Sequence, residues 1–268
     1  MSVFNAVIDR ILGWYFAAFG WSPGIGLAVL SLLAGVGMLW VFAKTSKPDR
    51  IRAVKRKVYA HLLELRVYGD EPMVMWRAQK SLLKSNLRYM ALMLAPALWM
   101  ALPVAILLVH LESYYGRAPL GVGQEAILTA GVRGGLDTAP KLEAPRGIAV
   151  ETEPVRVLAE NQVSWRLRPT APVSGTLRLT IGGETVEKSI DAGGAARLVS
   201  DRRVSSAWDA LWHPGEPVLA SRNVEWAQIH YPGKEVELAG IRLHWLVWFL
   251  IFSMGSALLL KKRFRVVL

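Results

Sequence analysis

Histidines are the side chains of this chain with the most versatile chemistry, because imidazole can act as an acid, a base or a metal ligand. The five of them, His61, His110, His213, His230 and His244, are spread along the sequence without an HExxH, GxSxG or phosphate-loop motif. Only His213 has close acidic neighbours, Asp209 and Glu216, in the stretch DALWHPGE. A histidine in such a Pro-Gly loop is more often a surface hydrogen-bonding residue than a ligand. We therefore expect no catalytic residue, no metal site and no cofactor, and a protein that is not an enzyme.

Composition narrows the class of protein. The chain has no cysteine, which excludes disulfides, thiolate catalysis and cysteine-ligated metals. Its net charge of +11 indicates a negatively charged partner, either nucleic acid or anionic lipid. Hydrophobic residues make up 53% of the 268 positions, and they gather in three blocks. Such clustering is typical of a membrane protein rather than of a well-packed soluble one.

The three apolar blocks predict three transmembrane helices. The first, residues 24–43, contains no charged residue over 20 positions, which is the length that a helix needs to cross about 30 Å of hydrocarbon. The second covers residues 89–111 and contains Pro96 and Pro103, and the third covers residues 241–260. His110 and His244 would lie at the outer membrane edge, where interfacial solvent accounts for them. The glycines of the first block are spaced for close helix packing; they are Gly24, Gly26, Gly35 and Gly37.

Residues 1–23 precede the first block and are too polar to span a membrane. They contain Asn5, Asp9 and Arg10, and they do not have the pattern of a signal peptide. Their apolar residues recur at helical spacing, namely Val3, Val7, Ile8, Ile11, Leu12 and Tyr15. We expect an amphipathic helix in the outer membrane interface.

Charge sets the expected orientation. Residues 44–88 hold twelve Lys and Arg against four Asp and Glu, a balance of +8, and the tail 261–268 adds four cations. Residues 112–240 hold fourteen Lys and Arg against sixteen Asp and Glu, a balance of −2. By the positive-inside rule, the N-terminus and 112–240 are extracytoplasmic, and 44–88 and the C-terminus are cytoplasmic. The expected location is the bacterial cytoplasmic (inner) membrane, as a multi-pass protein.

Residues 44–88 are expected to form a basic helical hairpin. The first arm carries an apolar stripe of Ile51, Val54, Val58, Leu62 and Leu65, and the second carries Met73, Trp76, Leu83, Leu87 and Met90. This spacing predicts a short antiparallel, coiled-coil-like pair with a turn at YGDEP. Candidate lipid or ribosome contacts on the first arm are Arg50, Arg52, Lys55, Arg56 and Lys57. Anionic headgroups, at about 1 kcal/mol per cation, are one partner, and ribosomal RNA or an acidic client is another. DNA is not expected, since no aromatic residues are interleaved for base stacking.

In residues 112–240 the pattern of apolar and polar residues changes to a period of two. VSWRLRP, GTLRLTIGG and ETVEKSID alternate apolar and polar residues between Gly, Pro and Asn. Residues 181–184, IGGE, predict a hairpin turn, and 205–219 predict a short helix or an irregular loop. The fold class predicted for the whole chain is an α-helical integral membrane protein with three transmembrane helices, a cytoplasmic helical hairpin and an inserted β-sandwich-like extracytoplasmic domain.

Flexible thioethers and weakly polar serines occur within the three apolar blocks. Methionine suits a groove that accepts many apolar sequences, although ordinary packing accounts for any single one. The candidates for a client groove are Ser31, Met38, Met90, Met93, Met100, Ser253, Met254 and Ser256.

The order of elements resembles the YidC-type membrane-protein insertase superfamily, including its three-span relatives. The likeness covers about residues 3–111, where a span opening with Gly20-Trp21 leads to a basic hairpin and then to LLKSNLRYMALMLAPALWMALPVAILL. Pro96 and Pro103 lie near the two family prolines, and 241–268 corresponds to the last core helix with its basic tail KKRFRVVL. The family's bacterial members carry a cation in the first core helix, whereas SLLAGVGMLW has none.

The resemblance implies an insertase-like protein or membrane chaperone that receives apolar client segments between its spans, with nascent membrane proteins or the ribosome as partners. The alternative is a non-catalytic, membrane-anchored scaffold or accessory subunit whose β domain binds a protein partner. A cavity lined by Ser31, Met93 and Ser253 would favour insertion, and helices that are tightly packed or splayed without a shared cavity would favour the scaffold.

Overall fold

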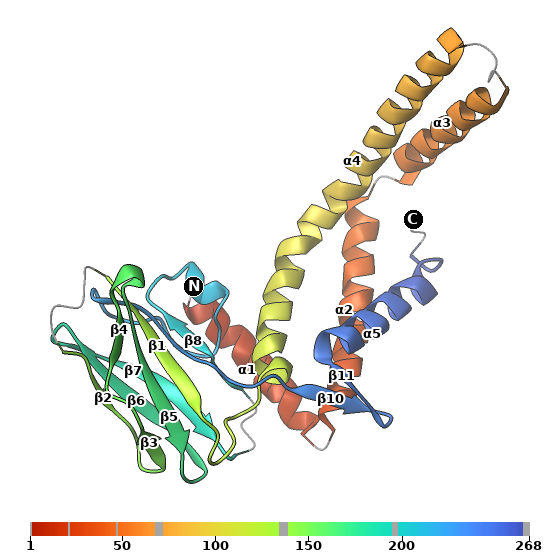
Figure 1. The fold of residues 1–268 in the computed structure, drawn as a ribbon. Coiled ribbons are helices and arrows are strands. Elements are labelled where there is room, and N and C mark those ends of the chain that lie inside the picture. Colours follow the sequence, from red (N-terminus) through yellow and green to blue (C-terminus); the bar gives the residue numbers. More distant parts are fainter. Residues whose placement is uncertain are drawn as a thin grey trace. The chain divides into compact units, whose positions relative to one another are not determined.

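The computed structural model describes residues 2–20, 22–46, 48–67, 72–133, 139–194 and 198–264. Its α-helices are α1 (Ser2–Ala18), α2 (Pro23–Thr45), α3 (Pro48–Val67), α4 (Pro72–Leu111) and α5 (Trp245–Leu260) (Figure 1). The chain divides into two compact units. Residues 1–26 and 106–245 form what we call the β unit, and residues 27–105 and 246–268 form the helical unit.

The β unit is built from antiparallel strands in three sheets. The largest has six strands in the order β3-β5-β1-β9-β8, with β4 also paired to β5; the others are β2-β6-β7 and β10-β11. The strands are β1 (Ala126–Val132), β2 (Lys141–Glu143), β3 (Ile148–Val150), β4 (Val155–Val157), β5 (Gln162–Pro169), β6 (Val173–Ile181), β7 (Glu184–Ala192), β8 (Arg202–Val204), β9 (Val224–Ile229), β10 (Glu235–Leu238) and β11 (Ile241–His244). Short helical turns are η1 (Glu112–Gly116), η2 (Leu158–Glu160) and η3 (Asp209–Leu211).

Alternation along the strands produces the core of the β unit. Val163, Trp165 and Leu167 of β5 and Leu177 and Leu179 of β6 are each at most 2% exposed and belong to one buried cluster. The six-stranded and three-stranded sheets therefore share a core, and each such side chain contributes about 1.5–3 kcal/mol when it is fully buried.

The predicted turn at 181–184 is confirmed. β6 and β7 pair from Ile181–Glu184 outwards, and the two connecting residues, Gly182 and Gly183, have φ values of 60° and 80°. Only glycine adopts this conformation without strain, and it matches the two-residue hairpin turn that fits the twist of the strands.

Side chains of the β unit hold the nearest ends of the apolar helices. The Tyr115 hydroxyl donates to the Pro23 carbonyl at 3.1 Å, and the Tyr15 hydroxyl donates to the Gly26 carbonyl at 2.9 Å. The Trp245 indole N–H donates to Glu112 at 2.7 Å. The first turn of α2, the π-helical turn η1 after α4 and the first residue of α5 are thus all fixed by hydrogen bonds within this unit.

Two helices are long and apolar enough to cross a membrane by length and composition, residues 23–45 and residues 79–116, and each has most of its residues in the helical unit. α5 is apolar but has only 16 residues, or about 24 Å. α2 and α5 approach closely at Gly35, where a Cβ would overlap Ser256 Oγ and lie 2.9 Å from the Ser253 Cα. This confirms Gly35 as a packing residue, whereas Gly37 has nothing within 4 Å of a Cβ. The two other predicted packing glycines, Gly24 and Gly26, are also close-packed, but within the β unit.

Two boundaries differ from the sequence prediction. The third apolar helix begins at Trp245 rather than at residue 241, because Ile241–His244 pairs with Glu235–Leu238 as β11. α4 is one helix of 40 residues, so the second arm of the hairpin and the second apolar block are continuous. The prediction for residues 205–219, a short helix or an irregular loop, is confirmed, since they contain the short 3₁₀ turn η3 within irregular chain.

The predicted coiled-coil packing of the hairpin is wrong for the second arm. Ile51 and Val54 of α3 are buried, but Met73, Trp76 and Leu83 of α4 are 69%, 71% and 61% exposed. Among the described side chains of the two predicted stripes, Ile51 and Val54 are the buried ones. The turn residues 68–71, the Leu65 side chain, Trp21 and residues 265–268 of the tail lie outside the described residues.

Candidate functional site

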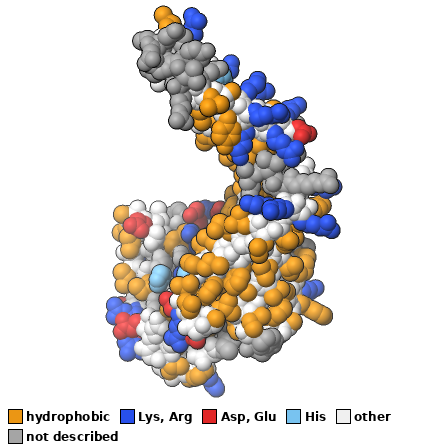
Figure 2. Space-filling model, turned by 90° about the vertical axis from the view of Figure 1, so that its right-hand side faces the viewer, with side chains coloured by type: hydrophobic (Ala, Val, Ile, Leu, Met, Phe, Trp, Pro, Cys, Tyr) orange, Lys and Arg blue, Asp and Glu red, His pale blue; other side chains and the backbone are white. Residues whose placement is uncertain are grey.

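α4 carries exposed apolar side chains along most of its length. Only 6% of its most apolar window is buried. Leu98, Trp99 and Leu102 are 63%, 76% and 52% exposed, and with Ala95 and Pro103 they line an apolar hollow of about 570 Å³. Figure 2 shows hydrophobic side chains spread over the surface of the helices and Lys and Arg gathered on the hairpin. The helix thus presents an apolar surface that this chain itself leaves uncovered there.

The predicted basic contacts share α3 with exposed apolar residues. Arg50, Arg52, Arg56 and Lys57 are exposed and Lys55 is half-buried. Arg52 lies 3.7 Å from Asp49 in a surface ion pair, which contributes little to stability. Exposed side chains of the same helix are Tyr59, Leu62 and Leu63. A basic and apolar surface of this kind fits either a lipid headgroup layer or a client with negative and apolar parts.

The predicted groove residues separate into two groups. The serines are buried: Ser31 donates to the Leu27 carbonyl at 2.6 Å, and Ser256 donates to the Leu32 carbonyl of α2 at 3.3 Å. Ser253 is 4% exposed beside Gly35. The prediction that the serines line an open groove is therefore wrong, because small residues let α2 and α5 approach and their hydroxyls bond nearby carbonyls. Met90 and Met254 are exposed, and Met38, Met93 and Met100 are half-buried.

His110 is fully buried rather than solvated at an edge. Its Nδ1 bonds the Ile106 carbonyl at 2.8 Å, and its Nε2 lies 3.8 Å from Asp9 Oδ1 of α1. Burial raises the pKa of Asp9, and the nearby His110 opposes that shift. α1 is held on this side by Leu12 and Phe16, whose ring packs on Tyr114 at 4.4 Å.

A buried ion pair joins β7 to the loop before β9. Lys188 is fully buried, forms an ion pair with Glu216 and donates to the Ser200 carbonyl at 2.8 Å. Glu216 also accepts from the Ser189 hydroxyl at 2.8 Å and from its N–H at 3.1 Å. Burial alone would raise the pKa of Glu216, but Lys188 and Ser189 bring it below its ordinary value. Burial lowers the pKa of Lys188, and Glu216 opposes that shift.

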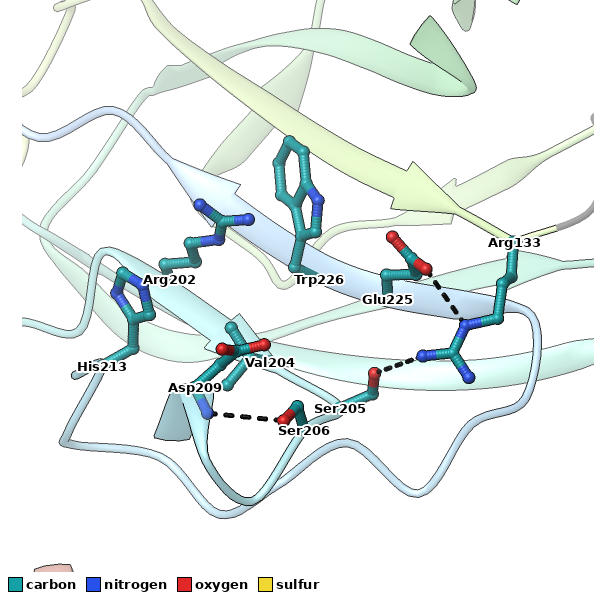
Figure 3. A pocket seen from close by; sticks show the side chains of 9 residues that line it. All are labelled: Arg133, Arg202, Val204, Ser205, Ser206, Asp209, His213, Glu225 and Trp226. Atoms are coloured by element: carbon teal, nitrogen blue, oxygen red, sulfur yellow. Dashed lines mark hydrogen bonds and ion pairs between the residues drawn. The ribbon is translucent and has the colours of Figure 1, made fainter. Parts of the chain in front are cut away.

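Glu216 is therefore unavailable to His213, so the acid–base or metal pair considered for HPGE does not form. Within the described ranges, no group of three or more His, Cys, Asp or Glu is placed to hold a metal ion. His213 instead lines a polar pocket of about 310 Å³ in the β unit (Figure 3). The pocket is lined by Arg133, Arg202, Val204, Ser205, Ser206, Asp209, His213, Glu225 and Trp226.

Sequence reasoning missed Lys188 and this pocket. One signal was available for Lys188, because in ETVEKSIDA it occupies the same parity as the buried Val186 and Ile190. A charged residue at a core-facing position requires a partner. The pocket had no comparable signal, since its residues come from β8, β9, the residue that follows β1 and the loop around η3.

Comparison with known proteins finds no matching family model, no matching curated protein and no matching solved structure.

Proposed function

We propose that this chain is an insertase-like protein or membrane chaperone that guides apolar client segments along α4. The observation that carries the proposal is the continuity of α4: its 40 residues form a rod of about 60 Å, twice what a bilayer core requires. Exposed apolar side chains run from Met73 and Trp76 at one end to Trp99 and Leu102 further along. An apolar segment can thus be bound before it enters lipid and remain in contact as it moves.

The arrangement proposed for the membrane follows from charge and length. α2, the apolar part of α4 and α5 are the three spans, and α3 with the first part of α4 is the cytoplasmic hairpin. The β unit, a β-sandwich-like domain, lies on the extracytoplasmic side of a bacterial inner membrane. The Lys- and Arg-rich cytoplasmic hairpin would lie near anionic headgroups and near an emerging nascent chain.

Two features support assisted insertion rather than simple anchoring. α5 is about 6 Å shorter than a bilayer core of about 30 Å, and a short span thins the bilayer around it. A thinner bilayer lowers the cost of moving the polar flanks of a client, which is several kcal/mol for each unsatisfied polar group. The likeness to the YidC-type superfamily in the order of elements agrees with this function.

Because the three serines are buried, the proposed client path differs from the groove predicted from the sequence. Since Ser31, Ser253 and Ser256 are enclosed by α2 and α5, the path is not that seam but the uncovered face of α4. Met90, Met93 and Met100 lie on α4, and Met90 is 59% exposed. These thioethers can adapt to client side chains of different shape.

Site-specific photocrosslinking during membrane-protein synthesis tests the proposal. A photoreactive residue at Leu98 or Trp99 is expected to crosslink to many different nascent chains. Leu259 of α5, which is 82% exposed, is the matched control for general exposure to lipid, and Ser253 is the buried control. Equal crosslinking at Leu259 and Trp99 would mean that the α4 face has no special role.

The second candidate function is the membrane-anchored scaffold or accessory subunit. The closed contact of α2 and α5 at Gly35 favours it, because two of the three apolar helices then act as a packed anchor. One constant partner crosslinked to α4 in place of many nascent chains would support the scaffold and contradict the insertase.

A further inference from the structure

The polar pocket of the β unit has a floor made by Trp226. In the register of β1 and β9, Trp226 is opposite Gly131, and a Cβ at Gly131 would overlap the indole, lying 3.0 Å from its Cδ1. The missing side chain lets the ring lie against β1. On Trp226 lies Arg202, with its guanidinium carbon 4.3 Å from the ring centroid. The aromatic floor thus fixes a guanidinium by cation–π attraction.

Arg202 is the cation of this pocket that makes no ion pair among the described residues. Its Nε is buried without a hydrogen-bond partner, and among the described residues no carboxylate lies within 4.0 Å of it. Arg133, in contrast, is engaged: its Nε lies 3.1 Å from Glu225 and its Nη2 donates to Ser205 at 3.4 Å. A buried donor without a partner is destabilising unless a ligand satisfies it.

The other residues that line the pocket provide hydrogen-bonding groups for a small polar molecule. Figure 3 shows His213 and Asp209 on the Arg202 side of the pocket and the Arg133–Glu225 pair on the other. Burial and the charge of Arg202 lower the pKa of His213, while Asp201 and Asp209 oppose that shift; the lowered pKa favours the neutral imidazole, which can donate or accept a hydrogen bond. The hydroxyls of Ser205 and Ser206 line the opening. The volume of about 310 Å³ is near the lower end of small-ligand pockets.

The geometry points to a binding site for the α-carboxylate of an amino acid or of the last residue of a peptide. The carboxylate would bind Arg202 in the bidentate manner that a guanidinium favours, above the Trp226 floor. Asp209, at the rim, would accept an N–H from the same ligand, and Val204 with the indole would contact its side chain. The site lies wholly within the β unit, and the proposal holds whether the helices insert clients or anchor a scaffold.

Calorimetric titration of the full chain in detergent micelles tests this site. The probes are N-acetyl-Ala-Ala with a free carboxylate and the same dipeptide as its amide. We expect saturable binding of the acid, about tenfold weaker binding of the amide, and about a tenfold loss with Arg202→Gln. The matched control is Arg178→Gln, since Arg178 is an exposed arginine paired with Glu187 outside the pocket; it should leave binding unchanged.

Arg202→Lys is the second variant, to be used if Arg202→Gln does not fold, because lysine keeps the charge and the aliphatic stem but lacks the planar guanidinium. We expect Arg202→Lys to bind the acid more weakly than the natural protein. Comparing free alanine with N-acetyl-Ala-Ala separates the two sources of the carboxylate, and tighter binding of either one supports the site. Equal binding of acid and amide, no saturable binding below about 10 mM, or full binding by folded Arg202→Gln would each overturn the proposal.

Discussion

Polar groups are buried in both units, but they find their partners differently: each buried serine of the helical unit bonds a carbonyl of its own helix, whereas the charge of Lys188 in the β unit depends on another segment. In the β unit, Lys188 is neutralised by Glu216, 28 positions away. In the helical unit, Ser31 bonds the carbonyl four positions before it, and Ser256 bonds that of Ser253 as well as Leu32 of α2. A helix offers its own carbonyls to a short hydroxyl, whereas a sheet leaves a buried charge dependent on another segment. The β unit should therefore be the more easily broken by loss of one polar side chain.

The largest effect is expected from Lys188→Met. It leaves the buried Glu216 carboxylate without its closest cation, with Arg203 at 4.0 Å as the remaining one, and breaking such a buried pair costs about 3–5 kcal/mol. Denaturant unfolding of the full chain, followed by circular dichroism of the β unit, measures the change. Lys141→Met, at an exposed lysine of β2, is the control and should change stability by less than about 0.5 kcal/mol. Recovery is expected in Lys188→Met/Glu216→Leu, where both charges are absent; no recovery would mean that the ion pair itself is the stabilising element.

Acid should reproduce part of that loss. The folded pKa of Glu216 lies below its unfolded value of about 4.3, so its contribution is fully present above that value and is lost as pH falls through the folded pKa. Thermal unfolding of the natural protein and of Lys188→Met/Glu216→Leu between pH 7 and pH 3 measures this. The double variant should have the flatter pH dependence, and parallel curves would assign acid sensitivity to other groups.

In the helical unit, Gly35→Ala is expected to cost about 1–3 kcal/mol, because its Cβ overlaps Ser256 and Ser253 where α2 meets α5. Gly37→Ala is the matched control on the same helix, with nothing within 4 Å of the added atom. The two variants are compared by unfolding in a denaturing detergent, with a fluorescent label on α5 reporting its separation from α2. If both variants behaved like the natural protein, the close α2–α5 contact would not stabilise the unit.

The smallest effect on stability is expected from Trp76→Ser on α4. Its side chain is 71% exposed, so stability should change by less than about 0.5 kcal/mol. Crosslinking of nascent chains at Trp99 should nevertheless fall, since the proposed path begins at this end of α4. Destabilisation with unchanged crosslinking would give Trp76 a packing role instead and would narrow the difference between the two units.

Local patterns determined much of this protein. The uncharged run at 24–43 predicted a helix, since in an apolar medium such a run satisfies its backbone polar groups only that way. Gly182-Gly183 between alternating strands determined a two-residue hairpin. The apolar stripe of α1 likewise determined a helix, although its partners, Tyr114 and Tyr115, are a hundred positions distant.

Only the tertiary structure decided which faces are covered and which polar groups meet. Spacing alone assigned Ser31, Ser253 and Ser256 to a groove, but the approach of α5 at Gly35 encloses them. Spacing also placed Met73 and Trp76 in a packed hairpin, but both side chains are exposed. The sequence pattern left His213 as a surface residue near Asp209 and Glu216, whereas His213 lines the pocket with Arg202 and Trp226, and Glu216 pairs with Lys188. Periodicity reports one element at a time, and these contacts join elements far apart in the chain.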